Sequence, residues 1–485
     1  MPPGVALAAL ASLLDNQAVF GFVANPNTRA AASPQSLSSV GGFFMVYDET
    51  GKTDLIQMLM SASQPAGATP AITKYAFGGT SVEVRTTNGS AMYTAHAGGF
   101  FLASNQRRTI EDLITRFQGA GPPAASLGQL PEYQAIVKYL GSDTSLDFFG
   151  RVPDFIKWIP PGEKYTSLVH FLEGLHLEAV HAAGEGISFS GEATRLRGAI
   201  LGDASPGSLF DIVGPSSATF LTQPVMGAAP AFRISRVDFA ATYRIVFRAI
   251  SEALTSQQMA SVAAMEGMAQ NYLGMSIDDA LALFSGEIAE ASFYSDDGTP
   301  QSLVALTIEK PDDVLRILRA VVGKMTVAED TSGNTTYLDL LFPYKDPATG
   351  AQRRIFYFVA VTPQMLLAAP RKAMLQAAAE QLDSPSGGAV SGSIFADPEY
   401  IQMRSLLPKN LSGLTGAEID RIPWDKLAAK LENQREQTRK QSNSRAPDFS
   451  WLSSIKFEVI SRHLHWNVGG WWKDSTGIYS DSYIQ

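Results

Sequence analysis

In the second half of the chain, short apolar runs alternate with segments whose apolar residues recur at helical spacing. Residues 288–293 and 303–308 are apolar runs on either side of Asp297-Gly298, a dipeptide typical of a β-hairpin turn. A helix is predicted to begin at Pro311, because proline suits the first turn and the acids that follow it favour the helix dipole. Its apolar stripe comprises Val314, Ile317, Leu318 and Val321, and Gly323 ends it.

The same alternation of strands and helices occurs elsewhere along the chain. Two further hairpins are predicted, one around residues 346–350 and one around Asn88-Gly89, whose sequence favours a type I′ turn. Their flanking strands are residues 337–342 and 355–359 in the first case and 82–87 and 91–96 in the second. Antiparallel strands interleaved with packing helices are typical of the α+β class, so we predict an α+β fold.

Segments of the first half resemble segments of the second half, in the same order. The clearest pair is Leu130–Leu140 and Asp397–Leu407, which both place Pro-Glu-Tyr at the head of an apolar-periodic segment. The other pairs are 13–22 with 283–293, 43–60 with 304–321, 99–117 with 364–382, and 175–193 with 456–472. Five ordered matches indicate an internal duplication; two unrelated α+β domains with coincidental patterns are the alternative. We predict two homologous halves, residues 1–234 and 235–485, each an antiparallel sheet with packing helices.

The duplication also makes predictions about individual side chains. Tyr133 and Tyr400 should occupy equivalent positions, as should Phe101 and either Leu366 or Leu367. The side chains expected in the core of the second half are Phe293, Leu306, Ile317 and Phe358.

The second half opens with a lead-in that the first half lacks. Residues 231–237 form a short extended segment, and Asp238 is a suitable N-cap for the amphipathic helix that follows. A Met- and Ala-rich helix containing Met259, Met265 and Met268 comes next. These methionines could line an adaptable binding groove, but packing against other helices in the core is the interpretation that we favour.

A repeat without this lead-in would leave sheet and helix faces uncovered in the first half. We therefore expect roughly 40–60 further residues upstream of Met1 in the gene product, preceded by a cleavable export signal. The alternative is that Met1 is the true start and that another chain, or the helices between the halves, covers these faces.

Composition narrows the range of functions. Of 485 residues, 45% are apolar and 18% are charged, and the net charge is −9, from 38 Lys and Arg against 47 Asp and Glu. An acidic chain without a basic cluster argues against a nucleic-acid partner. The absence of cysteine excludes disulfides, thiolate metal sites and cysteine catalysis. The apolar run at residues 5–14 is too short to cross a bilayer, so we predict no transmembrane segment and leave membrane-surface association open.

Candidate catalytic and metal-binding residues are few. His463 and His465 would share one face of a strand and could present two imidazoles to a metal, but no spacing signals further ligands. Ser453 and Lys456 form a Ser-x-x-Lys motif, which requires a helix, whereas Lys456 begins a strand-like run. We therefore predict no catalytic residue, no cofactor and no metal site.

Two recurring features have both structural and functional interpretations. Glu132 and Glu399 follow proline in both halves, and an acid in the first turn of a helix explains them without catalysis. Trp466, Trp471 and Trp472 lie within seven residues, and tryptophan is enriched at binding hot spots. The three tryptophans are therefore a candidate partner interface, although they could equally close the sheet of the second half.

Three segments resemble an uncharacterised bacterial family, the domain of unknown function 3352. They are LFSGEIAEASF at 283–293, KPDDVLRIL at 310–318 and LLAAPRKAM at 366–374. The resemblance implies an extracytoplasmic bacterial protein, either periplasmic, secreted or on the cell surface, and assigns no chemistry to any residue.

These observations favour a non-enzymatic function. The leading hypothesis is a structural or interaction component of a larger extracytoplasmic assembly, with a protein partner or self-association. A binding protein or carrier for an apolar small molecule or lipid is the second hypothesis, and it requires a cavity between sheet and helices. A hydrolase whose site is assembled from dispersed residues is the third, and it requires perturbed titratable groups that cluster in a cleft.

Overall fold

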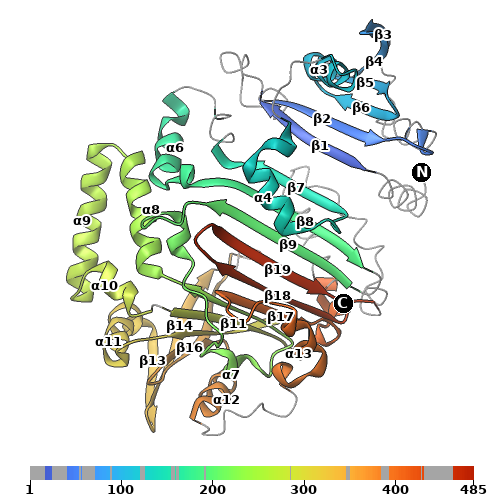
Figure 1. The fold of residues 1–485 in the computed structure, drawn as a ribbon. Coiled ribbons are helices and arrows are strands. Elements are labelled where there is room, and N and C mark those ends of the chain that lie inside the picture. The colour runs from blue at the N-terminus through green and yellow to red at the C-terminus, as the bar shows by residue number, and fades with distance from the viewer. Residues whose placement is uncertain are drawn as a thin grey trace. The chain divides into compact units, whose positions relative to one another are not determined.

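The chain folds around two antiparallel sheets, each in its own compact unit (Figure 1). The structure is a computed structural model that describes residues 17–24, 41–53, 56, 71–87, 90–120, 126–153, 159, 163–190, 193–284, 286–345, 350–383, 393–427, 429–430 and 463–485. One unit comprises Met1–Gln134 and Asp154–Val169, and the other comprises Ala135–Pro153 and His170–Gln485. The predicted α+β class is confirmed.

The first unit contains a six-stranded sheet in the order β1-β2-β6-β5-β4-β3. These strands span Ala18–Ala24 (β1), Gly41–Asp48 (β2), Ala71–Phe77 (β3), Thr80–Thr87 (β4), Ser90–Ala97 (β5) and Phe100–Ser104 (β6). Helix α3 (Arg107–Phe117) packs on one face of the sheet, where it buries Ile110 and Ile114 against Leu102. The strands that flank Asn88-Gly89 are confirmed as β4 and β5, and the turn itself lies outside the described residues.

The second unit contains a sheet of thirteen described strands in the order β13-β14-β15-β16-β12-β11-β10-β17-β18-β19-β9-β8-β7. The strands are β7 (Leu146–Arg151), β8 (Val180–Ser190), β9 (Ala193–Gly202), β10 (Ala231–Val237), β11 (Gly286–Tyr294), β12 (Pro300–Thr307), β13 (Thr326–Ser332), β14 (Thr335–Lys345), β15 (Gln352–Val361), β16 (Met365–Ala369), β17 (Gly413–Glu418), β18 (Trp466–Lys473) and β19 (Gly477–Ile484). All neighbouring strands in it are antiparallel.

Helices flank this sheet and connect its strands. They are α7 (Gln223–Met226), α8 (Phe239–Ala253), α9 (Ser256–Leu273), α10 (Ile277–Ala282), α11 (Pro311–Val322), α12 (Lys372–Asp383) and α13 (Pro398–Ser405), with α4 (Pro131–Leu140) and α6 (Glu163–Gly174) where the chain passes between the units. Local signals set their ends. The Asp238 carboxylate accepts a hydrogen bond from the Ala241 N–H at the start of α8, and Gly274 adopts a left-handed conformation at the end of α9.

The described elements of the two halves follow the same order. β1-β2-β6-β5-β4-β3 in the first sheet corresponds to β11-β12-β16-β15-β14-β13 in the second, and β7-β8-β9 corresponds to β17-β18-β19. Tyr133 and Tyr400 both stand third in their helices, α4 and α13, and Phe101 and Leu366 both stand second in β6 and β16. The positions expected to be equivalent therefore lie on corresponding elements.

The two compact units divide the chain differently from the halves expected from the sequence. Strands β7 to β9 belong to the first half, but they extend the sheet of the second half because β9 pairs with β19. The six strands β17-β18-β19-β9-β8-β7 therefore consist of two corresponding three-strand units, β17 to β19 and β7 to β9, which meet at their last strands. The physical reason is that backbone pairing of β9 with β19 satisfies the hydrogen-bonding groups that each would otherwise leave at an edge.

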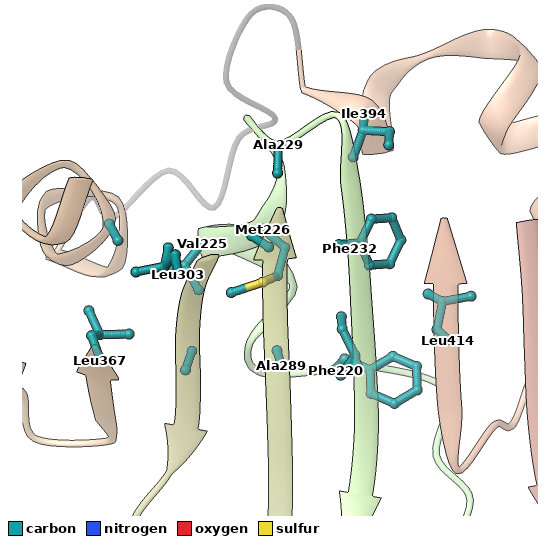
Figure 2. Close-up of a cluster of buried hydrophobic side chains, with 14 of the residues drawn as sticks. Phe220, Val225, Met226, Ala229, Phe232, Ala289, Leu303, Leu367, Ile394 and Leu414 are labelled. Carbon is teal, nitrogen blue, oxygen red and sulfur yellow. The ribbon is translucent and has the colours of Figure 1, made fainter. Parts of the chain in front are cut away.

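The largest core covers one face of the second sheet. Its side chains come from β10, β11, β12, β15, β16, β17, β18, α7, α12 and α13 and from segments between them, and Figure 2 shows the part around Met226 and Phe232. Of the four predicted core residues, Ile317 is buried, whereas Phe293, Leu306 and Phe358 are only half-buried. The prediction for Leu306 fails because neighbouring residues of β12 alternate between faces, and it is Leu303 that points into the core.

A pair of leucines on β12 tests this assignment of faces. Leu303→Ala should lower the free energy of unfolding by about 2–5 kcal/mol, because the side chain is 2% exposed and its removal leaves a cavity. Leu306→Ala should cost clearly less, because that side chain is half-buried on the opposite face. Denaturant unfolding of both variants measures the difference, and equal losses would contradict the assignment.

Candidate interaction surface

The predicted histidine pair and the recurring glutamates form no chemical site in the described part of the chain. His463 and His465 are both exposed, and the Nδ1 atom of His465 lies 2.7 Å from the Oδ2 atom of Asp420. No group of three metal-ligating side chains occurs among the described residues. Glu132 and Glu399 lie in the first turns of α4 and α13, where the structural interpretation placed them. Ser453 and Lys456 lie outside the described residues.

A buried carboxylate at the start of β11 has a structural role. Glu287 is 2% exposed, and its Oε1 atom accepts a hydrogen bond from Nη2 of Arg236 at 2.8 Å. The other carboxylate oxygen accepts from the backbone N–H and the hydroxyl of Thr222, at 2.9 and 3.1 Å. Both oxygens are therefore occupied by partners that tie β10 and β11 to the segment before α7, and the group offers no open atom for chemistry.

A second buried carboxylate lies where β9 meets β19. The two oxygens of Asp481 accept hydrogen bonds from Nε and Nη2 of Arg195 at 2.9 and 2.5 Å, a bidentate pair. The Tyr483 hydroxyl lies 3.3 Å from Asp481, and the Arg195 guanidinium stacks 4.9 Å from the Tyr483 ring. Burial, together with the charge of Asp481, raises the pKa of Tyr483 to about 12. The cluster joins two strands.

A depression beside the turn between β11 and β12 is open and charged. It has a volume of about 400 Å³ and is lined by Asp296, Asp297, Lys426, Ala429 and Lys430. Hydrogen bonds from Ser295 and Thr299 lower the pKa of Asp297 and close the turn between β11 and β12. A depression with this lining does not resemble the enclosed apolar cavity that a lipid carrier requires.

The three tryptophans of β18 point to both faces of the sheet. Trp466 is 3% exposed and packs beside Tyr400 in the core. Trp472 shares that face and contacts Tyr479, while Trp471 lies on the opposite face with the guanidinium of Arg233 5.3 Å from its ring. Because adjacent residues of a strand alternate in direction, these side chains do not form one surface.

Helix α9 presents a surface that the sequence pattern assigned to the core. Met265, Met268 and Tyr272 are 60%, 64% and 61% exposed, and their spacing of three and four residues places them along one side of the helix. We call this side, with Ser261 and Ala264, the α9 surface; both of these residues are also exposed. The core interpretation of the methionines is therefore wrong for Met265 and Met268.

Polar contacts hold α9 in place, and one of them comes from the α9 surface itself, because the Tyr272 hydroxyl donates a hydrogen bond to the backbone carbonyl of Ala320 in α11. The Tyr243 hydroxyl donates a hydrogen bond to Glu266 at 2.8 Å, and Thr255 and Gln258 form a capping box at the start of the helix. Glu266 is the only charged residue in the eighteen residues of α9. The α9 surface is consequently uncharged. The feature of the sequence that could have revealed its exposure is that this Ala- and Met-rich helix lacks an amphipathic pattern.

Comparison with known proteins identified no matching family model, curated protein or solved structure. The resemblance to the extracytoplasmic family therefore stays a prediction. Within the described residues, no helix combines the length and the apolar character that crossing a membrane requires.

The tyrosine at the junction of β9 and β19 gives a pH prediction. An unfolded tyrosine ionises near pH 10, whereas folded Tyr483 stays neutral until about pH 12. Its contribution to stability is therefore complete below pH 10 and is lost as the pH rises from 10 towards 12. The free energy of unfolding of Tyr483→Phe should therefore fall less than that of the wild type as the pH rises through this range. Denaturant titrations at several pH values measure both free energies, and an equal fall in the two proteins would contradict the prediction.

Proposed function

We propose that this chain is a non-enzymatic interaction component of a larger assembly and that it binds a partner protein through the α9 surface. The observation that carries the proposal is the exposure of Met265, Met268 and Tyr272 on an uncharged helix side. Large apolar side chains that cluster on a surface mark interaction sites more often than single ones do.

The chemistry of the α9 surface suits a protein partner. Removing a large apolar side chain from water contributes roughly 1.5–3 kcal/mol when burial is complete, and this surface offers three such side chains. Methionine adapts its shape to the surface opposite, and the tyrosine ring is rigid and amphipathic. An apolar groove that receives one side of a helix is the complementary partner.

An anionic membrane surface is a weaker candidate for the same site. Helices that lie on membranes carry Lys and Arg along their polar side, which attract the lipid head groups. Helix α9 has no basic residue among its eighteen residues. The electrostatic part of membrane binding is therefore missing, and the proposed partner is a protein.

An enzymatic function has less support from the described residues. The two buried carboxylates, Glu287 and Asp481, accept hydrogen bonds from fixed partners that join strands. No group of three metal-ligating side chains occurs in the described part of the chain. The charged depression beside Asp297 is open to solvent and lies at a turn. These features support a structural use of the charged groups.

We also infer that the two halves arose by duplication of one α+β unit. The matching order of the described strands in the two six-stranded modules supports this, as do the ordered sequence matches between residues 1–234 and 235–485. The resemblance to the extracytoplasmic family supports a location outside the cytoplasm. A bacterial cell surface or periplasm is the compartment in which we expect the assembly.

A charge placed on the α9 surface tests the proposed function. In the natural host, the double variant Met265→Glu, Met268→Glu should be lost from the assembly, because two carboxylates would be desolvated at the interface. Native mass spectrometry of the extracted protein should then show the 52.1 kDa chain alone, while the wild type appears in a larger complex.

The matched control is Ile401→Glu, which introduces a carboxylate at a 52% exposed apolar position of another helix, α13. It should stay in the assembly like the wild type. The proposal is overturned if the wild-type protein is extracted without any partner, or if the double variant remains in the complex.

A further inference from the structure

The α9 surface carries the most accessible sulfur atoms in the described part of the chain. The side chains of Met265 and Met268 are 60% and 64% exposed, whereas every other methionine that the structure describes is half-buried or buried. Cysteine is absent from the sequence. An oxidant that reacts with sulfur therefore meets these two thioethers first, because oxidation of a sulfur atom follows its exposure.

The helix around the two methionines does not shield them. Met265 and Met268 stand three residues apart and so lie on the same side of α9. Their neighbours along the helix include Ala264, Gly267 and Ala269, which are too short to cover a thioether. Nothing outside the helix lies within 4 Å of the position that a Cβ would take on Gly267, so no other described element covers α9 at that point.

We propose that Met265 and Met268 are modification sites and that a peroxide oxidises both to methionine sulfoxide in the unassembled chain. Each oxidation moves two electrons from the sulfur to the peroxide. One S–O bond forms, the O–O bond breaks, and the second peroxide oxygen leaves as water with the proton of the first. A methionine sulfoxide reductase reverses the step, in which a dithiol becomes a disulfide and the sulfoxide oxygen leaves as water.

Oxidation changes the property on which binding through the α9 surface depends, so this inference rests on the proposed function. The sulfoxide is polar, whereas the thioether is apolar and adapts its shape to the surface opposite. In an apolar groove, two sulfoxide oxygens would lose their water without gaining a hydrogen-bond donor. The oxidised chain should therefore be excluded from the assembly, and reduction should return it.

Hydrogen peroxide treatment of the purified full chain tests the sites themselves. The intact mass should rise first by about 32 Da, the mass of two oxygen atoms, and peptide mapping should place them on Met265 and Met268. Both should react about tenfold faster than Met226 and Met365, which are 0% and 1% exposed. Equal rates at the four methionines overturn the inference whether or not a partner is found.

Reassembly tests the consequence of the modification. The purified chain, untreated or oxidised, is added to an extract of host cells that lack their own copy, and native mass spectrometry measures the fraction in the larger complex. Oxidation should lower the affinity about tenfold or more, because both sulfoxides must be desolvated. Treatment with two methionine sulfoxide reductases, one for each epimer, and a dithiol should restore assembly.

Two variants control for other effects of peroxide. The double variant Met265→Leu, Met268→Leu keeps apolar side chains of similar volume without sulfur, and it should assemble with or without peroxide treatment. Met374→Leu removes a half-buried methionine from another helix, α12, and should stay as sensitive to peroxide as the wild type.

The outcomes separate this inference from the proposed function. An untreated wild type that finds no partner overturns both. An oxidised wild type that assembles as well as the untreated protein overturns the inference alone, and so does a double leucine variant that loses assembly after peroxide treatment.

Discussion

The pairing of β9 with β19 joins the last three strands of the first half to the sheet of the second half. Eight residue pairs connect these strands, from Gly477 opposite Leu201 to Ile484 opposite Thr194. The bidentate contact between Arg195 and the buried carboxylate of Asp481 fixes the two strands side by side. Loss of Arg195 would leave the buried carboxylate of Asp481 uncompensated, which is far more costly than the net value of the pair itself.

The junction between β9 and β19 explains why the boundaries of the two compact units differ from the boundaries of the two predicted halves. The last strands of both halves are hairpins, β8–β9 and β18–β19, and each hairpin alone would end in an open edge. Joining the two edges satisfies both rows of backbone groups and makes one continuous sheet of the strands from β17 to β7. The six strands β1 to β6 retain their own sheet and their own core, and so they form the other unit.

Features that depend on neighbours in the sequence were predictable, and features that depend on distant contacts were not. The cap at Asp238, the end of α11 at Gly323 and the hairpin at Asp297 follow from backbone conformations that these residues favour locally. The junction of β9 with β19 joins segments far apart in the chain, and no local pattern encodes that register. The exposure of Met268 was missed for the same reason, because an apolar helix side is buried only if another element covers it.

The α9 surface follows from an asymmetry between the described elements of the two halves. In the described part of the chain, β10 and helices α8 to α10 have no counterpart in the first half. Because β10 fills the edge of β17, the same edge is left without a described strand on β7. Helix α9 belongs to the added segment, and although Tyr272 near its end donates a hydrogen bond to Ala320 of α11, Met265 and Met268 stay exposed. The described elements that the two halves share thus satisfy one another's contacts, whereas the segment found in one half alone carries exposed apolar side chains.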